Sequence, residues 1–373
     1  MAEYLPGSLR QLTPLQRYLH LDGPLLGLLA LLAGYGLVVL YSAFGGDVDA
    51  WQRQLWRLGL AFAVLVVLAQ IPPSVLRRWT PVLYGVGLVS LVAVLLVGVS
   101  AGGAQRWLHL WVINVQPSEL LKLALPMMVA YYLAAHGMPP RLPAVLVTLA
   151  LIAVPGGLIA MQPDLGTAVL VIAAGVFALF LAGLGWRYLL GGGLAAAAGM
   201  PLLWYFGMHD YQRERVLTFL NPERDPLGAG YHIIQSKIAI GSGGMYGKGW
   251  LAGTQSHLEF LPERHTDFVF AVLSEEFGFF GVCALLALYL AVVARGLWIA
   301  AYAQDHYGRL LAGSISLTFF VYFFINMGMV SGILPVVGLP LPLISYGGTS
   351  MVTLMAAFGI LMSIHTHRRL WSS

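Results

Sequence analysis

The segment PAVLVTLALIAVPGGLIAM, residues 143–161, decides the class of fold, because none of its 19 side chains is charged. About 20 consecutive apolar residues in a helix are enough to cross the hydrocarbon core of a bilayer. The remaining sequence has the same character: of 373 residues, 59% are hydrophobic and 10% are charged, with a mean hydropathy of +0.79. Soluble domains carry about 25% charged residues. The composition therefore excludes a soluble globular enzyme and indicates an integral membrane protein, whose excess apolar side chains face lipid.

Ten apolar segments predict an all-α integral membrane protein with ten transmembrane helices, in a single polytopic domain over residues 1–373. The predicted spans lie near residues 22–43, 53–71, 80–99, 117–136, 143–161, 165–183, 186–206, 267–301, 309–331 and 344–365. The eighth is longer than a bilayer requires, so its start is expected at or above the outer surface. The hydrophilic residues 207–266, between the seventh and eighth spans, are predicted to form a large extracytoplasmic loop.

The distribution of cationic residues sets the predicted orientation, because Lys and Arg are enriched in cytoplasmic loops. With the N-terminus inside, the cytoplasmic side carries ten arginines and three acids, and the other side carries ten bases and 13 acids. Both termini are therefore predicted inside (N-in/C-in). The first 20 residues lack a short apolar core followed by a cleavage site, so the first span is expected to be an uncleaved anchor.

Charge and cysteine content argue against a nucleic-acid-binding protein and against a disulfide-linked fold. The formal net charge is +4, but the bases are spread between apolar blocks rather than interleaved with aromatics, so no nucleic-acid partner is expected. Cys283 is the only cysteine, which excludes an internal disulfide.

The glycine-rich residues 241–249 do not form a phosphate-binding loop. Such a loop requires Gly where Ser242 stands, and Ser or Thr where Gly249 stands. These glycines are expected to allow a tight turn or a close approach to a ligand, and no nucleotide is expected.

Two ionisable groups open the fourth predicted span. Glu119 and Lys122 are three residues apart, so both project from one helical face. The pair either anchors the start of the helix or lines a polar cavity, with Lys122 available to an anionic ligand. Asp164 opens the sixth span, where helix capping is the favoured interpretation.

The densest ionisable cluster, residues 257–268, ends where the eighth span begins. Thr266 could cap that helix, with Asp267 stabilising its first turn. His265 and Asp267 could ligate a metal, although two ligands without a third are weak evidence. Asp267 could also act as a general base toward a polar, lipid-linked substrate. The spacing leaves these alternatives open.

Several motifs in a fixed order make the chain resemble the SEDS family (shape, elongation, division and sporulation), and its rod-shape branch more than its division branch. The motifs are Gln116-Pro117-Ser118-Glu119 with Lys122, Gln162 to Thr167, Gly247-Lys248-Gly249-Trp250, Gly253-Thr254-Gln255, Leu261 to Phe268, Glu275-Glu276, Pro340-Leu341-Pro342 and Ser345 to Gly348. Lys248 departs from the pattern, because many relatives have glutamine there.

The resemblance implies a peptidoglycan glycosyltransferase that polymerises lipid II outside the bacterial cytoplasmic (inner) membrane during cell elongation. By resemblance, Asp267 is the catalytic residue, and Glu119 and Lys122 form a cavity pair. The acceptor GlcNAc 4-hydroxyl would attack the donor MurNAc C1 with inversion, and undecaprenyl diphosphate would leave. Diphosphate needs charge stabilisation rather than protonation, so one carboxylate base is enough.

Cations would stabilise the diphosphate of the substrate, and Lys122 and Arg215 are the first candidates, followed by Arg106, Arg213 and Lys248. In addition to Glu119 and Lys122, the predicted substrate-binding residues are Arg215, Arg106, Arg213, Lys248 and Gln235. A divalent cation, Mg²⁺ or Mn²⁺, could share this task, and its ligands are unknown.

Two other functions compete with polymerisation: a lipid II flippase and a non-catalytic scaffold for cell-wall synthases. A flippase should place charges along a path through the membrane, whereas here they gather at the outer end. By resemblance, the expected partner is a class B penicillin-binding protein, a transpeptidase. Membrane lipids would surround the helices.

Overall fold

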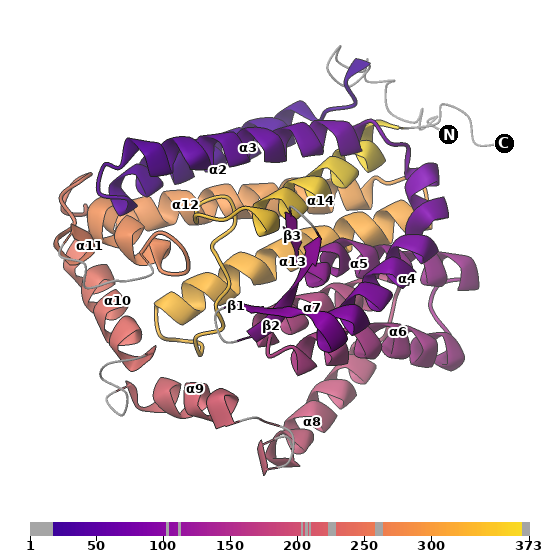
Figure 1. The fold of residues 1–373 in the computed structure, drawn as a ribbon. Helices are drawn as coiled ribbons and strands as arrows, with labels where there is room; N and C mark the ends of the chain where they lie inside the picture. The colour runs from indigo at the N-terminus through magenta and orange to yellow at the C-terminus, as the bar shows by residue number, and fades with distance from the viewer. Residues whose placement is uncertain are drawn as a thin grey trace, which may run out of the picture.

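The computed structural model describes residues 18–101, 104–110, 113–202, 204–205, 208, 210–222, 229–257 and 264–367. These residues form a predominantly helical protein with one small sheet (Figure 1). Within them, eight helices are long and apolar enough to cross a membrane: α2 (Gly23–Ala43), α3 (Val48–Ala69), α4 (Pro73–Val97), α5 (Pro117–His136), α6 (Leu142–Met161), α12 (Val269–Ala301), α13 (His306–Val330) and α14 (Thr349–Thr366). The chain is therefore a multi-pass membrane protein.

Two predicted spans correspond to shorter helices, α7 (Leu165–Leu181) and α8 (Trp186–Leu202), each of 17 residues. Every predicted span thus has a helix, while the count of ten crossings stays a prediction. The third helix begins at Pro73 rather than near residue 80, because a proline is favourable in the first turn of a helix.

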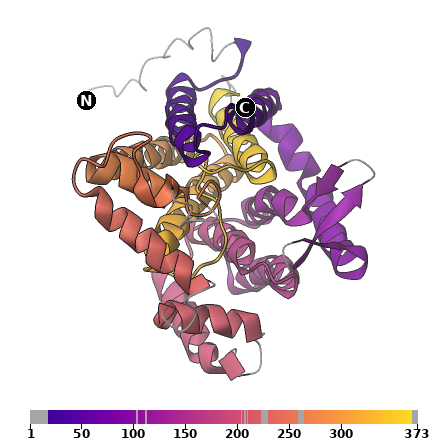
Figure 2. The same cartoon turned by 60° about the vertical axis from the view of Figure 1, so that its left-hand side comes forward.

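The centre of the bundle is formed by α5, α7, α13 and α14. The most apolar windows of α13 and α14 are 61% and 72% buried, against 28% for α3 and α4. Helix α13 packs against α12, α7 and α5, and α14 packs against α3. Figure 2 shows α8 and α9 (Asp210–Leu220) projecting from one side of this bundle. The central helices therefore carry few lipid-facing positions, and polar groups on them are enclosed by protein.

A three-stranded antiparallel sheet, in the order β1-β2-β3, joins α4 to α5. Its strands are β1 (Val99–Ala101), β2 (Ala104–Leu110) and β3 (Ile113–Val115). The all-α prediction did not include it. Short β-branched and aromatic stretches form strands through their pairing with neighbours, and a search for long apolar spans does not detect them.

The predicted large outer loop contains α9, α10 (Ala229–Gly243) and α11 (Thr254–His257). Helix α10 packs against α12. Helix α12 is interrupted at Gly278, whose φ of 63° is non-helical. A Cβ at Gly278 would lie 2.2 Å from the backbone nitrogen of Gly247. The extra length predicted for the eighth span is thus a separate first segment, packed against the backbone of the loop.

Candidate active site

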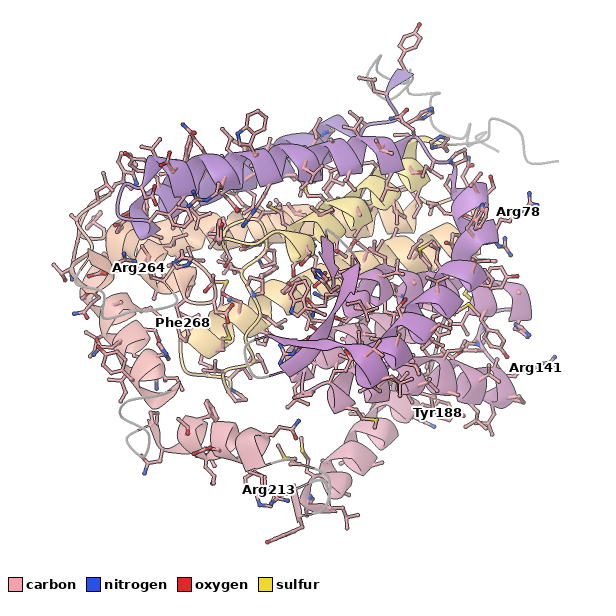
Figure 3. All side chains as sticks on the ribbon, in the orientation of Figure 1. Arg78, Arg141, Tyr188, Arg213, Arg264 and Phe268 are labelled. Atoms are coloured by element: carbon pink, nitrogen blue, oxygen red, sulfur yellow. The ribbon has the colours of Figure 1, made fainter. Side chains whose placement is uncertain are left out.

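Asp267 lies in a turn directly before α12 and is partly exposed. The N-cap of α12 is Phe268, whose side chain makes no capping hydrogen bond, and the first turn contains no acidic residue. Thr266 is therefore not the N-cap residue, and Asp267 lies before the first turn rather than in it. Figure 3 places Arg264 and Phe268, on either side of this turn, near one another at the start of α12.

The Glu119–Lys122 pair is close and buried. The Lys122 ammonium donates to Glu119 Oε1 at 2.7 Å, and the two side chains are 11% and 8% exposed. Ser350 at the start of α14 donates to the same oxygen at 2.9 Å. The ammonium also lies 5.3 Å from the ring centroid of Tyr322 on α13, within the range of a cation–π contact. The pair therefore joins three helices and is more than an anchor at the start of α5.

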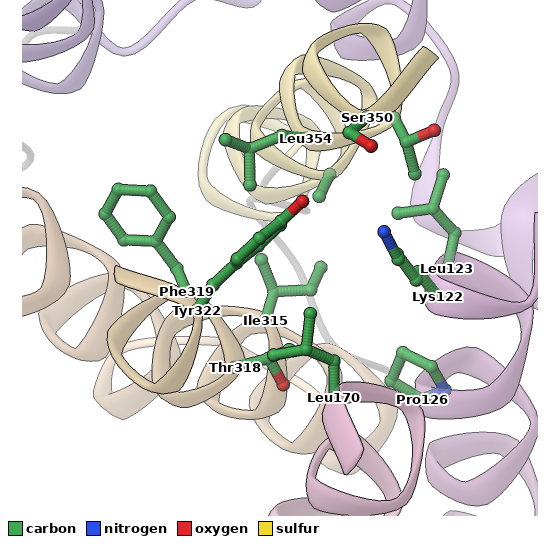
Figure 4. A pocket seen from close by; sticks show the side chains of 12 residues that line it. Lys122, Leu123, Pro126, Leu170, Ile315, Thr318, Phe319, Tyr322, Ser350 and Leu354 are labelled. Atoms are coloured by element: carbon green, nitrogen blue, oxygen red, sulfur yellow. The ribbon is translucent and has the colours of Figure 1, made fainter. Parts of the chain in front are cut away.

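A small cavity of about 40 Å³ adjoins this pair, between α5, α13 and α14. Figure 4 shows the Lys122 nitrogen directed into it, facing Ser350 and Tyr322, with apolar side chains such as Ile315 and Leu170 around the rest. Glu119 Oε2 is buried and has no hydrogen-bond partner among the described residues. A cationic group in mostly apolar surroundings attracts an anion more strongly than it would in water.

Arg106 is held by the residues that open α7. It donates to the carbonyl of Pro163 at 2.5 Å and lies 3.9 Å from Asp164. Asp164 accepts from the backbone N–H of Thr167 at 3.2 Å, so the predicted capping role of Asp164 is confirmed. Gln116 also donates to Asp164, at 3.2 Å. Arg106 therefore ties the sheet to the start of α7, next to the segment that leads into α5.

The Lys248 side chain forms hydrogen bonds with other side chains of the protein. Its ammonium donates to Glu275 at 2.7 Å and to the Thr254 hydroxyl at 2.8 Å. The glycines beside it bring loop and α12 backbones together: a Cβ at Gly247 would lie 2.1 Å from the Glu276 carbonyl oxygen. The loop backbone thus lies closely against α12, and the predicted approach to a ligand stays a prediction.

The remaining predicted substrate-binding residues are Arg213, Gln235 and Arg215. Arg213 donates to the carbonyls of Trp204 and Tyr205, at 2.8 and 3.0 Å, and Figure 3 shows it near the junction of α8 and α9, away from Phe268. Gln235 lies half-buried on α10. Arg215 belongs to α9, but its side chain lies outside the described residues.

The metal interpretation of His265 gains no support from its surroundings. Its ring packs 5.6 Å from Phe44 and 5.9 Å from Tyr346, between ring centroids. Within the described ranges, no three His, Cys, Asp or Glu side chains are grouped as metal ligands. An all-protein metal cage is therefore not present in this part of the chain.

Tyr322, Ser350 and Asn326 are not indicated by the sequence motifs. Asn326 carried a usable signal, because it is the one amide side chain between Leu310 and Val330, inside a predicted span. A strongly polar residue within a span usually has a specific partner. Ser350 near the start of α14 and Tyr322 within α13 are common residue types in membrane helices and carry no comparable signal.

Comparison with known proteins gives a consistent result. The family model of FtsW, RodA and SpoVE, described as cell cycle proteins, matches residues 24–370. The peptidoglycan glycosyltransferase MrdB of Escherichia coli K12 is 55% identical over 353 residues, 95% of each chain. A probable peptidoglycan glycosyltransferase FtsW of Trichlorobacter lovleyi is 38% identical, over 93% of this chain and 94% of its own.

Solved structures agree over nearly the whole chain. One is a chain of a peptidoglycan synthase complex that coordinates polymerization and crosslinking; it has a TM-score of 0.81 and 37% identity, covering 94% of this chain and all of its own. The rod shape determining protein RodA of Thermus thermophilus has a TM-score of 0.71 and 31% identity, covering 93% and 97%.

Proposed function

This chain belongs to the FtsW, RodA and SpoVE family of cell cycle proteins, and from that premise we infer that it is a peptidoglycan glycosyltransferase. Its identity is 55% to MrdB and 38% to an FtsW relative, which supports a role in cell shape and elongation rather than division. The substrate is lipid II. The ten helices cross the bacterial inner membrane with both termini in the cytoplasm, and polymerisation takes place at the outer face.

Asp267 is the general base of this reaction. Its carboxylate takes the proton of the acceptor GlcNAc 4-hydroxyl while that oxygen forms a bond to the donor MurNAc C1. The bond from C1 to the phosphate oxygen breaks, and undecaprenyl diphosphate leaves with the electron pair. The proton on Asp267 then passes to water. The observation that carries this assignment is that Asp267 stands in a partly exposed turn directly before α12, inside the motif from Leu261 to Phe268.

Lys122 is the best-supported cation for the diphosphate. It is directed into a cavity, and its partner Glu119 also has a second, unpartnered oxygen. Arg106 and Lys248 also bind protein groups but, unlike Lys122, do not line this cavity, so we assign them to holding the site together. Arg213, Arg215 and Gln235 remain proposed as substrate-binding residues, with Arg215 and Arg213 as candidates for the diphosphate.

The described residues supply few ligands for a divalent cation such as Mg²⁺ or Mn²⁺. Because three protein ligands are not grouped among the described residues, the ion would be held by Asp267 together with the phosphates of the substrate. Mg²⁺ is commonly bound in this manner. When bound, it would neutralise negative charge on the diphosphate.

The proposed partner is a class B penicillin-binding protein, which crosslinks the new glycan. The similarity to a chain from a complex that coordinates polymerization and crosslinking supports this proposal.

The deciding experiment incubates the purified protein, with its transpeptidase partner, with lipid II and separates glycan chains on a gel. Asp267→Asn should abolish polymer. Asp305→Asn is the matched control, because Asp305 caps α13 by accepting from the Gly308 N–H, and asparagine caps equally well. A folded Asp267→Asn protein that still polymerises lipid II would show that the base is another group. Intact transport of lipid II with no polymer from the wild type would favour the flippase.

A further inference from the structure

The main chain that carries Asp267 is held by residues of α13 and of the loop before α14. The carbonyls of residues 265, 266 and 267 each accept a hydrogen bond. Their donors, in that order, are the Tyr346 backbone N–H at 2.7 Å, the Ser345 hydroxyl at 2.5 Å and the Asn326 side-chain amide at 3.0 Å. These three donor residues come from α13 and from the loop before α14.

Asn326 connects two backbones that meet at Asp267. Its side chain is fully buried, and the same amide nitrogen donates to the Leu339 carbonyl at 2.6 Å. Leu339 follows Gly338, whose φ is +72°, and a Cβ at Gly338 would lie 3.4 Å from Asp267 Oδ2. The amide therefore fixes both the peptide on which the carboxylate stands and the loop against which the carboxylate lies.

Ser345 also connects two backbone segments. Its hydroxyl donates to the Thr266 carbonyl and accepts from the Leu341 N–H at 2.7 Å, so it also closes its own loop. Both side chains are buried, at 0% and 4% exposure, so water cannot replace these bonds without entering the protein. An amide with two N–H donors fits a position between two carbonyls, whereas a carboxylate has only acceptors.

A turn outside regular secondary structure has no helical bonds to fix it. A general base must nevertheless lie within hydrogen-bond reach of its proton, and a misplacement of about 1 Å can lower the rate about 100-fold. We propose that Asn326 and Ser345 are positioning residues for Asp267, acting through the carbonyls of residues 266 and 267. This inference rests on the proposed role of Asp267 as the base.

The test measures initial rates of lipid II polymerisation against lipid II concentration for Asn326→Asp and Ser345→Ala, as full-length protein with its partner. The carboxylate of Asn326→Asp would face two carbonyls, and Ser345→Ala removes one donor. We expect kcat to fall about 10- to 100-fold, with KM within about twofold of wild type, because substrate contacts are kept. Melting temperatures are recorded for each variant.

Ser314→Ala is the matched control. Ser314 is equally buried on α13 and donates to the Ala174 carbonyl at 2.7 Å, away from Asp267. It should lower the melting temperature to an extent comparable with Ser345→Ala while keeping kcat. A wild-type kcat in folded Ser345→Ala and Asn326→Asp, or an equal kcat loss in Ser314→Ala, would overturn the positioning role. The role of Asp267 as the base is tested separately by Asp267→Asn. If that variant polymerises lipid II normally, the proposed role of Asp267 is wrong, whatever the Asn326 and Ser345 variants show. If Asn326→Asp does not fold, Ser345→Ala alone decides.

Discussion

The Lys248 ammonium and the Glu275 carboxylate, 27 residues apart in sequence, meet at 2.7 Å beneath the glycine-rich loop. The Glu275 side chain is 0% exposed and that of Lys248 is 27% exposed. Glu275 Oε1 also accepts from Thr254 and from the Gln255 N–H, at 3.1 and 3.0 Å. A cation expected from sequence to bind substrate is thus engaged in holding the loop on α12.

Lys248→Met should therefore reduce stability more than substrate binding. It leaves a buried carboxylate without its cation, which we expect to lower the free energy of unfolding by about 3 kcal/mol. Thermal unfolding in detergent measures this change, and KM for lipid II should stay unchanged. The double variant Lys248→Met/Glu275→Gln should recover part of the loss. A normal melting temperature with a raised KM would instead make Lys248 a substrate contact.

Lys122→Ala should lower turnover, and it should also lower stability because it leaves the buried Glu119 carboxylate without its cation. Removing a cation that stabilises a leaving diphosphate is expected to lower kcat about 100- to 1,000-fold. Arg141→Ala, at the N-cap of α6, serves as a control for loss of a cation away from the cavity. Unchanged kinetics in Lys122→Ala, measured with lipid II in the gel assay, would remove Lys122 from the site.

Asp22, one residue before α2, predicts a pH dependence of stability. Burial opposes its ionisation, but hydrogen bonds from His365 and Arg295 outweigh this and lower the pKa of its carboxyl below the ordinary value of 3.8. A lowered pKa stabilises the folded state above about pH 4, and this stability is lost as the pH falls further.

Asp22→Asn isolates this effect, because asparagine can still cap α2 while the charge is lost. We expect a loss of about 3 kcal/mol at pH 7 and a flatter decline in melting temperature between pH 5 and about pH 3. Asp47→Asn, at the N-cap of α3, is the control: Asp47 accepts only backbone N–H groups in its cap. Parallel melting curves for wild type and Asp22→Asn over this range would contradict the prediction.

Gly278→Ala should disrupt the junction between α12 and the loop. The φ of 63° disfavours alanine, and its Cβ would overlap the Gly247 nitrogen, so a loss of about 3 kcal/mol or more is expected. Gly85→Ala on α4 is the control, because no atom lies within 4 Å of the new Cβ. It should be neutral or stabilising by up to about 1 kcal/mol. Melting temperatures in detergent compare the two, and equal values would contradict the packing described for Gly278.

Composition and apolar run length are sufficient to predict a helical multi-pass membrane protein, because burial of about 20 apolar residues in lipid is a local property of each segment. The sequence motifs likewise indicate Asp267, Glu119 and Lys122. By contrast, the donors to residues 265–267 and the partner of Lys248 depend on contacts between distant segments. Those contacts follow from helix packing, since a hydrogen bond across the bundle leaves no periodic signal in the sequence. Only the tertiary structure could therefore decide that Lys248 binds Glu275 and that Asn326 holds the turn bearing Asp267.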